Sequence, residues 1–424
     1  MKHSRRYSIM RLHSKIHMRI FGDGSKKTTG EPSTRKDFEY LQNEMVYFDS
    51  ACQTLRPQPV LDAMLSYFQE FNACGGRVKY AWGKRVDDEV EAVRSKILHH
   101  FGKSEKEYVV AFTLNTTYGL NLVLNQIPIG VYTQIITSEI EHNSVFLPTL
   151  VTAKRLSIPR EILKRTENGL LEYQNEDMAK AVCVLNAVSN IDGRVLLNAK
   201  TLAHDLHRMG GVLILDGAQS MAHDPSLLRE VDFDALCFSG HKTYAPSLGV
   251  VVIRKRFLDS LDLSFVGGGM VEKLDENNFT FPTQDPACKL EPGLQDFSGI
   301  VGLGVALNWL ETYKPQGQKQ KEYQEGLVTT IFEGLSKLPN LKILNSTPST
   351  IISFYSEKID SHRLATFLSQ QNIMVRSGYF CCHYYLQNVR KYPPLTRISL
   401  GLHNTEADVH AFLNVMEKII KNIE

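Results

Sequence analysis

Short apolar runs recur along the first part of the chain, and segments with helical periodicity separate them. The runs cover residues 108–113, 134–137, 181–185, 212–215 and 235–238, and the helical segments include residues 87–101, 116–125 and 199–208. Short continuous apolar runs bounded by polar residues are typical of buried strands in a parallel sheet. We therefore predict βαβ units throughout residues 108–252, which form an α/β fold with a mostly parallel sheet flanked by helices.

The C-terminal part of the chain has a different pattern. A helix with one apolar face is predicted at residues 301–313, strands at residues 341–344, 351–354, 373–376 and 396–400, and a last helix at residues 405–421. A chain of 424 residues exceeds one ordinary domain. We predict a large domain over residues 37–300 and a smaller α+β domain over residues 301–424.

Polar residues follow two of the apolar runs at the point where each predicted strand ends. Asp216 follows residues 212–215, and the sequence Ser239-Gly240-His241-Lys242 follows residues 235–238. Sites in parallel sheets lie at the carboxyl ends of the strands. An Asp and a Lys presented by neighbouring strands can serve a pyridinium cofactor, because the carboxylate keeps the ring nitrogen protonated and the amine forms a Schiff base with the aldehyde.

Composition and charge exclude several other classes of function. The net charge is +2, so there is no basic field that would indicate a nucleic-acid partner. No apolar run approaches the roughly 18 residues of a membrane helix. The seven cysteines include no Cys-x-x-Cys pair and indicate reduced intracellular thiols. We predict a cytoplasmic protein without a membrane, nucleic-acid or metal site.

Residues 1–36 are rich in Lys, Arg, His and Ser and contain only two acidic residues, Asp23 and Glu31. A disordered tail or an upstream start codon explains this composition, and we favour that interpretation because no clear amphipathic face emerges. The alternative is an organellar targeting peptide, which is also basic and poor in acidic residues.

The motif Asp216-x-x-Gln219, followed by Ser239-Gly240-His241-Lys242, resembles the class V branch of fold-type I pyridoxal-phosphate enzymes. Within that branch the chain is most similar to group II cysteine desulfurases and selenocysteine lyases. The likeness extends from about Val46 to the last helix. It implies a fold-type I architecture, pyridoxal 5'-phosphate as cofactor and a homodimer.

The resemblance also implies roles for residues around the cofactor ring. Lys242 corresponds to the Schiff-base lysine, Asp216 to the partner of the ring nitrogen, and Gln219 to a donor to the phenolate oxygen. His142 corresponds to the histidine that stacks on the ring and moves protons. Asn190 corresponds to a ligand of the phenolate or of the substrate carboxylate, although a turn residue before Asp192-Gly193 is the alternative.

The cofactor phosphate has its own predicted ligands. Residues 116–125 begin a helix with two threonines, and backbone N–H groups at a helix start can bind a phosphate. Thr116 and chiefly Thr117 are the expected contacts, with capping of the helix by Thr116 as the alternative. By resemblance, Ser239 and His241 complete the phosphate site.

One C-terminal segment determines the predicted reaction. Arg376-Ser377-Gly378-Tyr379-Phe380-Cys381-Cys382-His383 lies where group II desulfurases carry Arg-x-Gly-His-His-Cys, so Cys381 corresponds to their nucleophilic cysteine. Arg397 corresponds to the arginine that binds the substrate carboxylate, and Arg376 is a second predicted substrate contact. The segment departs from the family at Tyr379-Phe380 and at Cys382, so buried apolar cysteines are the alternative.

These features lead to three hypotheses. The first is a cysteine desulfurase that converts L-cysteine to L-alanine, with Cys381 or the neighbouring Cys382 holding the persulfide and a sulfur-acceptor protein as partner by resemblance. The second is another class V enzyme, such as a selenocysteine lyase, an aminotransferase or an epimerase. The third is a non-catalytic scaffold, against which the complete set of His142, Asp216, Gln219 and Lys242 argues.

Overall fold

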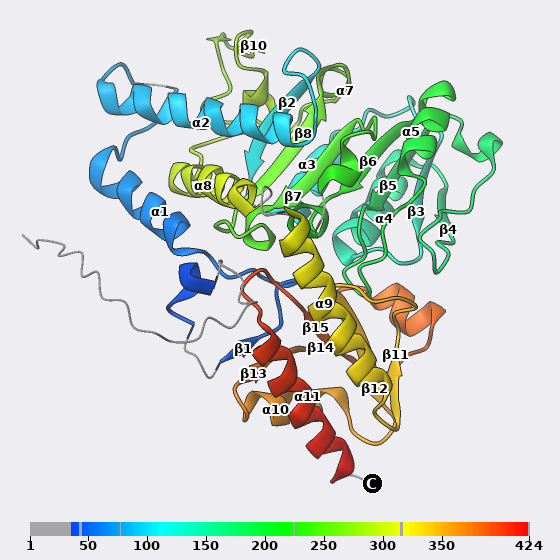
Figure 1. The fold of residues 1–424 in the computed structure, drawn as a ribbon. Helices are drawn as coiled ribbons and strands as arrows, with labels where there is room; N and C mark the ends of the chain where they lie inside the picture. Colours follow the sequence, from blue (N-terminus) through cyan, green and yellow to red (C-terminus); the bar gives the residue numbers. More distant parts are fainter. Residues whose placement is uncertain (1–34, 42–44, 77, 224, 314–316, 423–424) are drawn as a thin grey trace, which may run out of the picture. The chain divides into compact units, whose positions relative to one another are not determined.

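The computed structural model describes residues 35–41, 45–76, 78–223, 225–313 and 317–422 (Figure 1). The predicted tail lies outside these ranges except for Arg35 and Lys36, which belong to the 3-10 helix η1, Arg35–Phe38. No helix within the described ranges is both long enough and apolar enough to cross a membrane.

A seven-stranded sheet with the strand order β2-β8-β7-β6-β5-β3-β4 dominates residues 108–254. The strands are β2 Tyr108–Thr113, β3 Gln134–Ser138, β4 Arg160–Leu163, β5 Ala181–Asn186, β6 Val212–Asp216, β7 Ala235–Ser239 and β8 Gly249–Arg254. Neighbours from β7 to β4 run parallel, which confirms a mostly parallel sheet.

The prediction of βαβ units throughout residues 108–252 was wrong at strand β8. This strand is antiparallel to both of its neighbours, β2 and β7. Only residues 240–248 connect β7 to β8, which is too short for the crossover helix that a parallel pair needs.

The two faces of this sheet pack against different helices, because side chains alternate between the faces along each strand. Val110, Phe112, Leu213 and Leu215 contribute to one apolar core, and their sequence neighbours Val109, Ala111, Val212 and Ile214 contribute to the other. Helices α2 Ala81–His100, α5 Ala199–Arg208 and α8 Phe297–Tyr313 cover the first face, and helices α3 Thr116–Asn125 and α4 Asn143–Leu156 cover the second (Figure 1).

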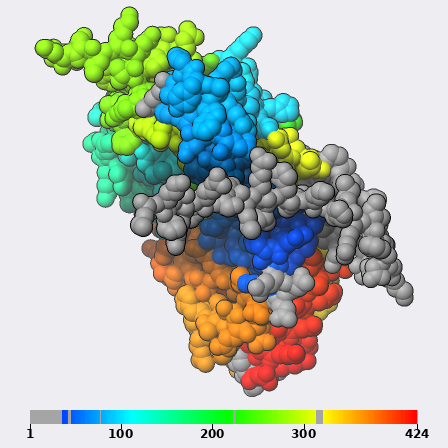
Figure 2. All heavy atoms as spheres, turned by 90° about the vertical axis from the view of Figure 1, so that its left-hand side faces the viewer, coloured from blue at the N-terminus to red at the C-terminus, as the bar shows by residue number. Residues whose placement is uncertain are grey.

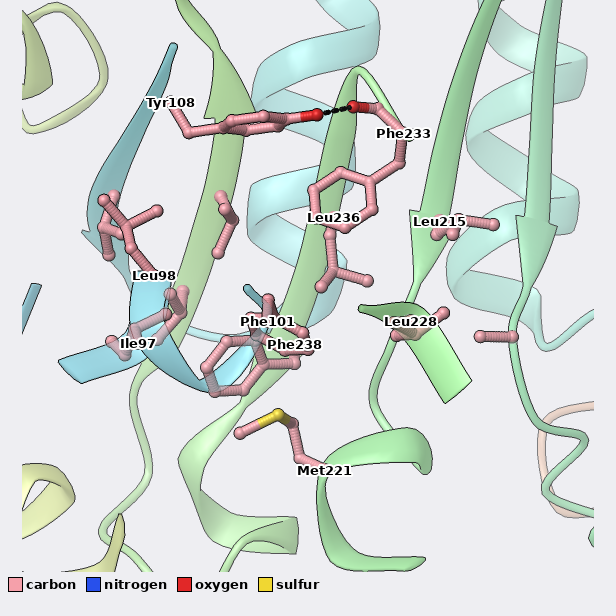
Figure 3. Close-up of a cluster of buried hydrophobic side chains, with 14 of the residues drawn as sticks. Ile97, Leu98, Phe101, Tyr108, Leu215, Met221, Leu228, Phe233, Leu236 and Phe238 are labelled. Carbon is pink, nitrogen blue, oxygen red and sulfur yellow. Dashed lines mark hydrogen bonds between the residues drawn. The ribbon is translucent and has the colours of Figure 1, made fainter. Parts of the chain in front are cut away.

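Figure 3 shows part of the first core, in which Ile97 of α2 and Phe101, the residue that follows α2, pack beside Phe238 of β7. The Tyr108 hydroxyl donates a 2.8 Å hydrogen bond to the Phe233 carbonyl at the edge of this core. Helix α2 begins at Ala81, six residues before the predicted start at Asp87. The sequence signal is weak there because the extra turns contain Gly83, which packs directly against the Val78 side chain.

The C-terminal part contains a four-stranded sheet with the order β11-β12-β15-β14. Its strands are β11 Leu341–Ile343, β12 Ile351–Ser356, β14 Arg376–Gly378 and β15 Leu395–Ser399, and its helices are α9 Gly317–Ser336, α10 Ser361–Ser369 and α11 Glu406–Lys421. The strand predicted at residues 373–376 was wrong as one element. Residues Ile373–Met374 form β13 and pair with β1, Val46–Tyr47, whereas β14 pairs with β15.

Helix α8 crosses the boundary predicted between residues 300 and 301, and the division into a large and a small domain stays a prediction. The N-terminal helix α1, Gln58–Glu70, packs beside α8, and Pro59 lies in its first turn, where the missing backbone N–H costs no intrahelical hydrogen bond. Residues 271–280 are exposed and carry the hairpin of β9 Lys273–Leu274 and β10 Phe279–Thr280, which projects in yellow-green at the top of Figure 2.

Candidate active site

A cavity of about 280 Å³ lies at the carboxyl ends of the central strands of the large sheet. Segments from both ends of the chain line it, including the loop after β1 and strands β14 and β15. The predicted site residues that line it are Thr116, Thr117, His142, Asn190, Asp216, Gln219, Ser239, His241, Lys242, Arg376 and Arg397. All the predicted site residues lie within the described part of the chain, and of these only Cys381 does not line the cavity.

Lys242 and Asp216 come from adjacent strands. Asp216 ends β6 and pairs in register with Cys237 of β7, and Lys242 ends the short 3-10 helix η4, Gly240–Lys242, that follows β7. Burial raises the pKa of the Asp216 carboxyl, opposed by the Ala218 N–H, which donates a 2.9 Å hydrogen bond, and by the charge of Lys242. Burial lowers the pKa of the Lys242 amine, Asp216 opposes this shift, and Arg397 adds to it.

His142 is the N-cap of helix α4. Its Nδ1 accepts a hydrogen bond from the Ser144 N–H at 3.0 Å and lies 2.8 Å from Ser144 Oγ. Burial lowers its pKa to about 3, with a further contribution from the positive charge of Lys242. The imidazole is therefore neutral at neutral pH and has an uncharged nitrogen for exchanging a proton in the cavity.

The predicted phosphate ligands meet at the start of helix α3. Ser239 Oγ accepts a hydrogen bond from the Thr116 N–H at 2.8 Å and lies 2.6 Å from Thr116 Oγ1. Thr117 Oγ1 lies 2.6 Å from Ser144 Oγ. Asn115, and not Thr116, caps the helix, because its side chain accepts from the Tyr118 N–H. The first-turn hydroxyls of α3 therefore face the neighbouring loops that line the cavity.

Asn190 and Gln219 each donate a hydrogen bond to the backbone through the amide nitrogen, and the amide oxygen of each has no partner in the described part of the chain. Asn190 Nδ2 donates to the Phe380 carbonyl at 2.8 Å, and Gln219 Nε2 donates to the Ala51 carbonyl at 2.8 Å. The amide oxygens of both side chains are buried and have no hydrogen-bond partner among the described residues. Buried polar atoms are normally paired, so these two indicate that the cavity is built to hold a polar ligand.

Arg397 is a buried cation with a protein partner. Its Nη2 lies 3.0 Å from Asp49 Oδ1, its Nη1 donates to the Asn190 carbonyl at 2.9 Å, and its guanidinium lies over the Phe380 ring. Arg376 faces Arg397 across the β14–β15 pair and donates a hydrogen bond to Cys52 Sγ. The two arginines make one wall of the cavity positively charged.

Cys381 and Cys382 have different environments. Cys382 is buried, its Sγ contacts the carbonyls of Ile140 and Glu141, and burial raises its pKa well above the ordinary value, which argues against Cys382 as the persulfide carrier. Cys381 is partly exposed. Phe380 and Cys381 have φ of 47° and 58°. This left-handed conformation costs roughly 1–3 kcal/mol for each residue other than glycine. The Asn143 N–H holds this turn by donating to the Cys381 carbonyl at 2.6 Å.

Comparison with known proteins identifies the family. Residues 46–412 match the family model described as Aminotransferase class-V.

The chain belongs to the aminotransferase class-V family.

Curated relatives of this class-V chain cover most of its length. It is 29% identical over 401 residues to a probable cysteine desulfurase of Haemophilus influenzae, covering 91% of this chain and 89% of the relative. It is 28% identical over 400 residues to cysteine desulfurase CsdA of Escherichia coli, covering 91% of this chain and 97% of the relative. The predicted family is therefore confirmed.

Solved structures share the fold of this class-V chain. The apo structure of a cysteine desulfurase from Thermococcus onnurineus is 26% identical, with a TM-score of 0.82 over 92% of this chain and 98% of that chain. A C-DES mutant with glycine covalently linked to its PLP cofactor is 19% identical, with a TM-score of 0.73 over 90% of this chain and 98% of that chain, and shows likeness of fold. The predicted fold class is confirmed.

Sequence patterns alone missed several residues of the class-V cavity. These are Ala51, Cys52, Asn115, Ser144, Asn186, Val188, Ala218 and Phe380. Five of them, Asn115, Ser144, Val188, Ala218 and Phe380, lie within two residues of predicted site residues, so their position in the sequence was an available signal. Cys52 and the Arg397 partner Asp49 come from the segment after β1, where no local pattern indicates contact with β14 and β15.

Proposed function

We propose that this chain is a pyridoxal-phosphate-dependent cysteine desulfurase that converts L-cysteine to L-alanine and transfers the sulfur to Cys381. The observation that carries the proposal is the Lys242 amine with the Asp216 carboxylate in one cavity, beside the buried Arg397 guanidinium. The relatives named cysteine desulfurase support the choice of L-cysteine among amino acids.

The residues of the cavity fit the cofactor. Lys242 would bond to its aldehyde, Asp216 would pair with its ring nitrogen, and the unpartnered amide oxygens of Asn190 and Gln219 border the same space. Thr116, Thr117, Ser239 and His241 would hold its phosphate. When bound, the cofactor supplies an aldehyde that binds the amino group of the substrate and a ring that accepts electrons from Cα.

Lys242 and His142 are the proposed proton carriers. The lowered pKa of Lys242 increases the fraction of free amine near neutral pH, which is the form that accepts a proton from Cα. The pKa of His142 is about 3, so its imidazole stays neutral and holds a proton only during transfer. Arg397 would bind the substrate carboxylate, because a guanidinium pairs with a carboxylate through two parallel hydrogen bonds.

The proposed sulfur transfer balances without an added oxidant. The Cys381 thiolate donates an electron pair to the substrate sulfur, the Cβ–S bond breaks, and its electron pair stays on the carbon skeleton. One proton completes alanine, and Cys381 keeps the sulfur as a persulfide. The sum is L-cysteine and a protein thiol to L-alanine and a protein persulfide.

The deciding experiment measures alanine and sulfide formed from L-cysteine by the cofactor-loaded chain in the presence of a thiol reductant. We expect equal amounts of both products, and at least about 100-fold slower release in Cys381→Ala. Cys74→Ala is the matched control, because Cys74 is also a partly exposed cysteine but lies outside the segment of residues 376–383 that carries Cys381. Absence of both products would refute the desulfurase.

One observation favours another class-V activity as the second candidate. Cys381 does not line the cavity. This position suits a selenocysteine lyase, an aminotransferase or an epimerase whose reaction does not use the Cys381 thiol. Such an enzyme would act on another amino acid at an unchanged rate in Cys381→Ala. The homodimer, the sulfur-acceptor protein and the cytoplasmic location stay predictions.

A further inference from the structure

Cys52 lines the cavity from the loop that follows β1. The loop is tied to the segment that carries Lys242, because the Thr54 N–H donates to the His241 carbonyl at 2.8 Å and Thr54 Oγ1 accepts from the Tyr244 N–H at 2.7 Å. Cys52 is partly exposed and forms no disulfide. Its thiol is therefore held at the wall of the cavity that also contains the reactive amine.

Charged side chains surround the Cys52 thiol. Arg376 donates a hydrogen bond to Cys52 Sγ, and the Lys242 amine interacts with the same thiol. Asp49 is the opposing group, since its carboxyl also interacts with Cys52, but Arg397 neutralises that carboxylate at 3.0 Å. Cationic neighbours lower the free energy of a thiolate and make it a better nucleophile at neutral pH.

The same cavity shows independently that a ligand belongs beside Cys52. Asn190 and Gln219 are 6% and 4% exposed, and both have an amide oxygen for which the described part of the chain offers no partner. Cys52 and these two side chains line one space, whereas Cys381 does not border it. A substrate held in this space therefore meets the Cys52 thiol without any movement of the Cys381 turn.

We propose that Cys52 is a second sulfur-accepting thiol of the cavity, which takes sulfur from the bound substrate in parallel with Cys381. The inference rests on the proposed desulfurase function. The Cys52 thiolate donates an electron pair to the substrate sulfur, an S–S bond forms, and the Cβ–S bond breaks. The electron pair stays on the carbon skeleton, a proton completes alanine, and Cys52 carries the persulfide. Two added thiols then leave as a disulfide, and sulfide is released.

The test maps the sulfur after one turnover of the cofactor-loaded full chain with L-cysteine and no reductant. The reaction is stopped with an alkylating agent, and each cysteine peptide is weighed by mass spectrometry. We expect an extra sulfur atom on the Cys52 peptide in the wild type and in Cys381→Ala. We also expect the residual alanine formation of Cys381→Ala to disappear in the double variant Cys381→Ala/Cys52→Ser, and Cys74→Ala to change neither result.

Cys52→Ser separates sulfur acceptance from a structural role, because a serine hydroxyl keeps the hydrogen bond from Arg376 but cannot hold a persulfide. A second readout needs no cofactor: Cys52 of the cofactor-free chain is expected to react with an alkylating agent several-fold faster than Cys74, because Arg376 donates a hydrogen bond to Cys52 Sγ. Replacement of Arg376 by Gln should remove that advantage.

The outcomes distinguish the two proposals. Alanine formation with the extra sulfur on Cys381 alone, or unchanged residual activity in the double variant, overturns the role of Cys52 and leaves the desulfurase intact. Absence of alanine in the wild type overturns the desulfurase and the Cys52 inference together.

Discussion

Asp49 is expected to stabilise the protein through its ion pair with Arg397, which lies 348 residues further along the chain. Two unit charges at the observed 3.0 Å interact by about 5 kcal/mol at an effective dielectric constant of about 20. Arg397 is buried, so loss of its partner leaves an uncompensated charge. Breaking a buried pair from one side costs about 3–5 kcal/mol. We therefore expect Asp49→Asn to lower the free energy of unfolding by about 3 kcal/mol.

The assay is urea unfolding of the cofactor-free chain at neutral pH. Asp88→Asn is the matched control, because Asp88 pairs with Lys84 at 2.6 Å but both side chains are more than half exposed, and such a pair contributes about 0.5 kcal/mol or less. A ligand with a free carboxylate, such as L-alanine, should restore more stability to Asp49→Asn than to the wild type. Equal losses in the two variants would refute the assigned burial of the Arg397 charge.

Three further predictions follow from individual contacts. Burial lowers the pKa of His403 to about 4, so as the pH falls below about 6.5 the unfolded chain binds a proton that the folded chain does not. Between pH 7 and pH 5 the free energy of unfolding of His403→Gln should therefore fall by about 2 kcal/mol less than that of the wild type. Equal losses in the two proteins would contradict this. Tyr108→Phe removes the hydrogen bond to the Phe233 carbonyl and should cost about 1–2 kcal/mol in urea unfolding, with no change in the urea dependence. Asp216→Asn should slow sulfide release about 100-fold while the absorbance of bound cofactor persists, and an unchanged rate would remove Asp216 from the proposed chemistry.

Local patterns were sufficient for most of the large sheet. The bounds predicted for residues 108–113, 116–125 and 199–208 agree with β2, α3 and α5 to the residue, because continuous apolar runs and helical periodicity are properties of neighbouring positions. The direction of β8 was predicted wrongly, because an apolar run by itself does not specify the direction of the strand. That direction depends on the length of the connection from β7.

The sequence by itself determined which residues end the parallel strands, and hence that Lys242 and Asp216 meet at one edge of the sheet. Only the tertiary structure decided which residues oppose them. The contacts between Arg397 and Asp49 and between Arg376 and Cys52 join positions 348 and 324 residues apart. Such contacts depend on how the C-terminal sheet packs against the segment after β1, and no periodicity along the chain encodes that packing. For the same reason the sequence predicted Cys381 but not Cys52, whose place in the cavity follows from the fold.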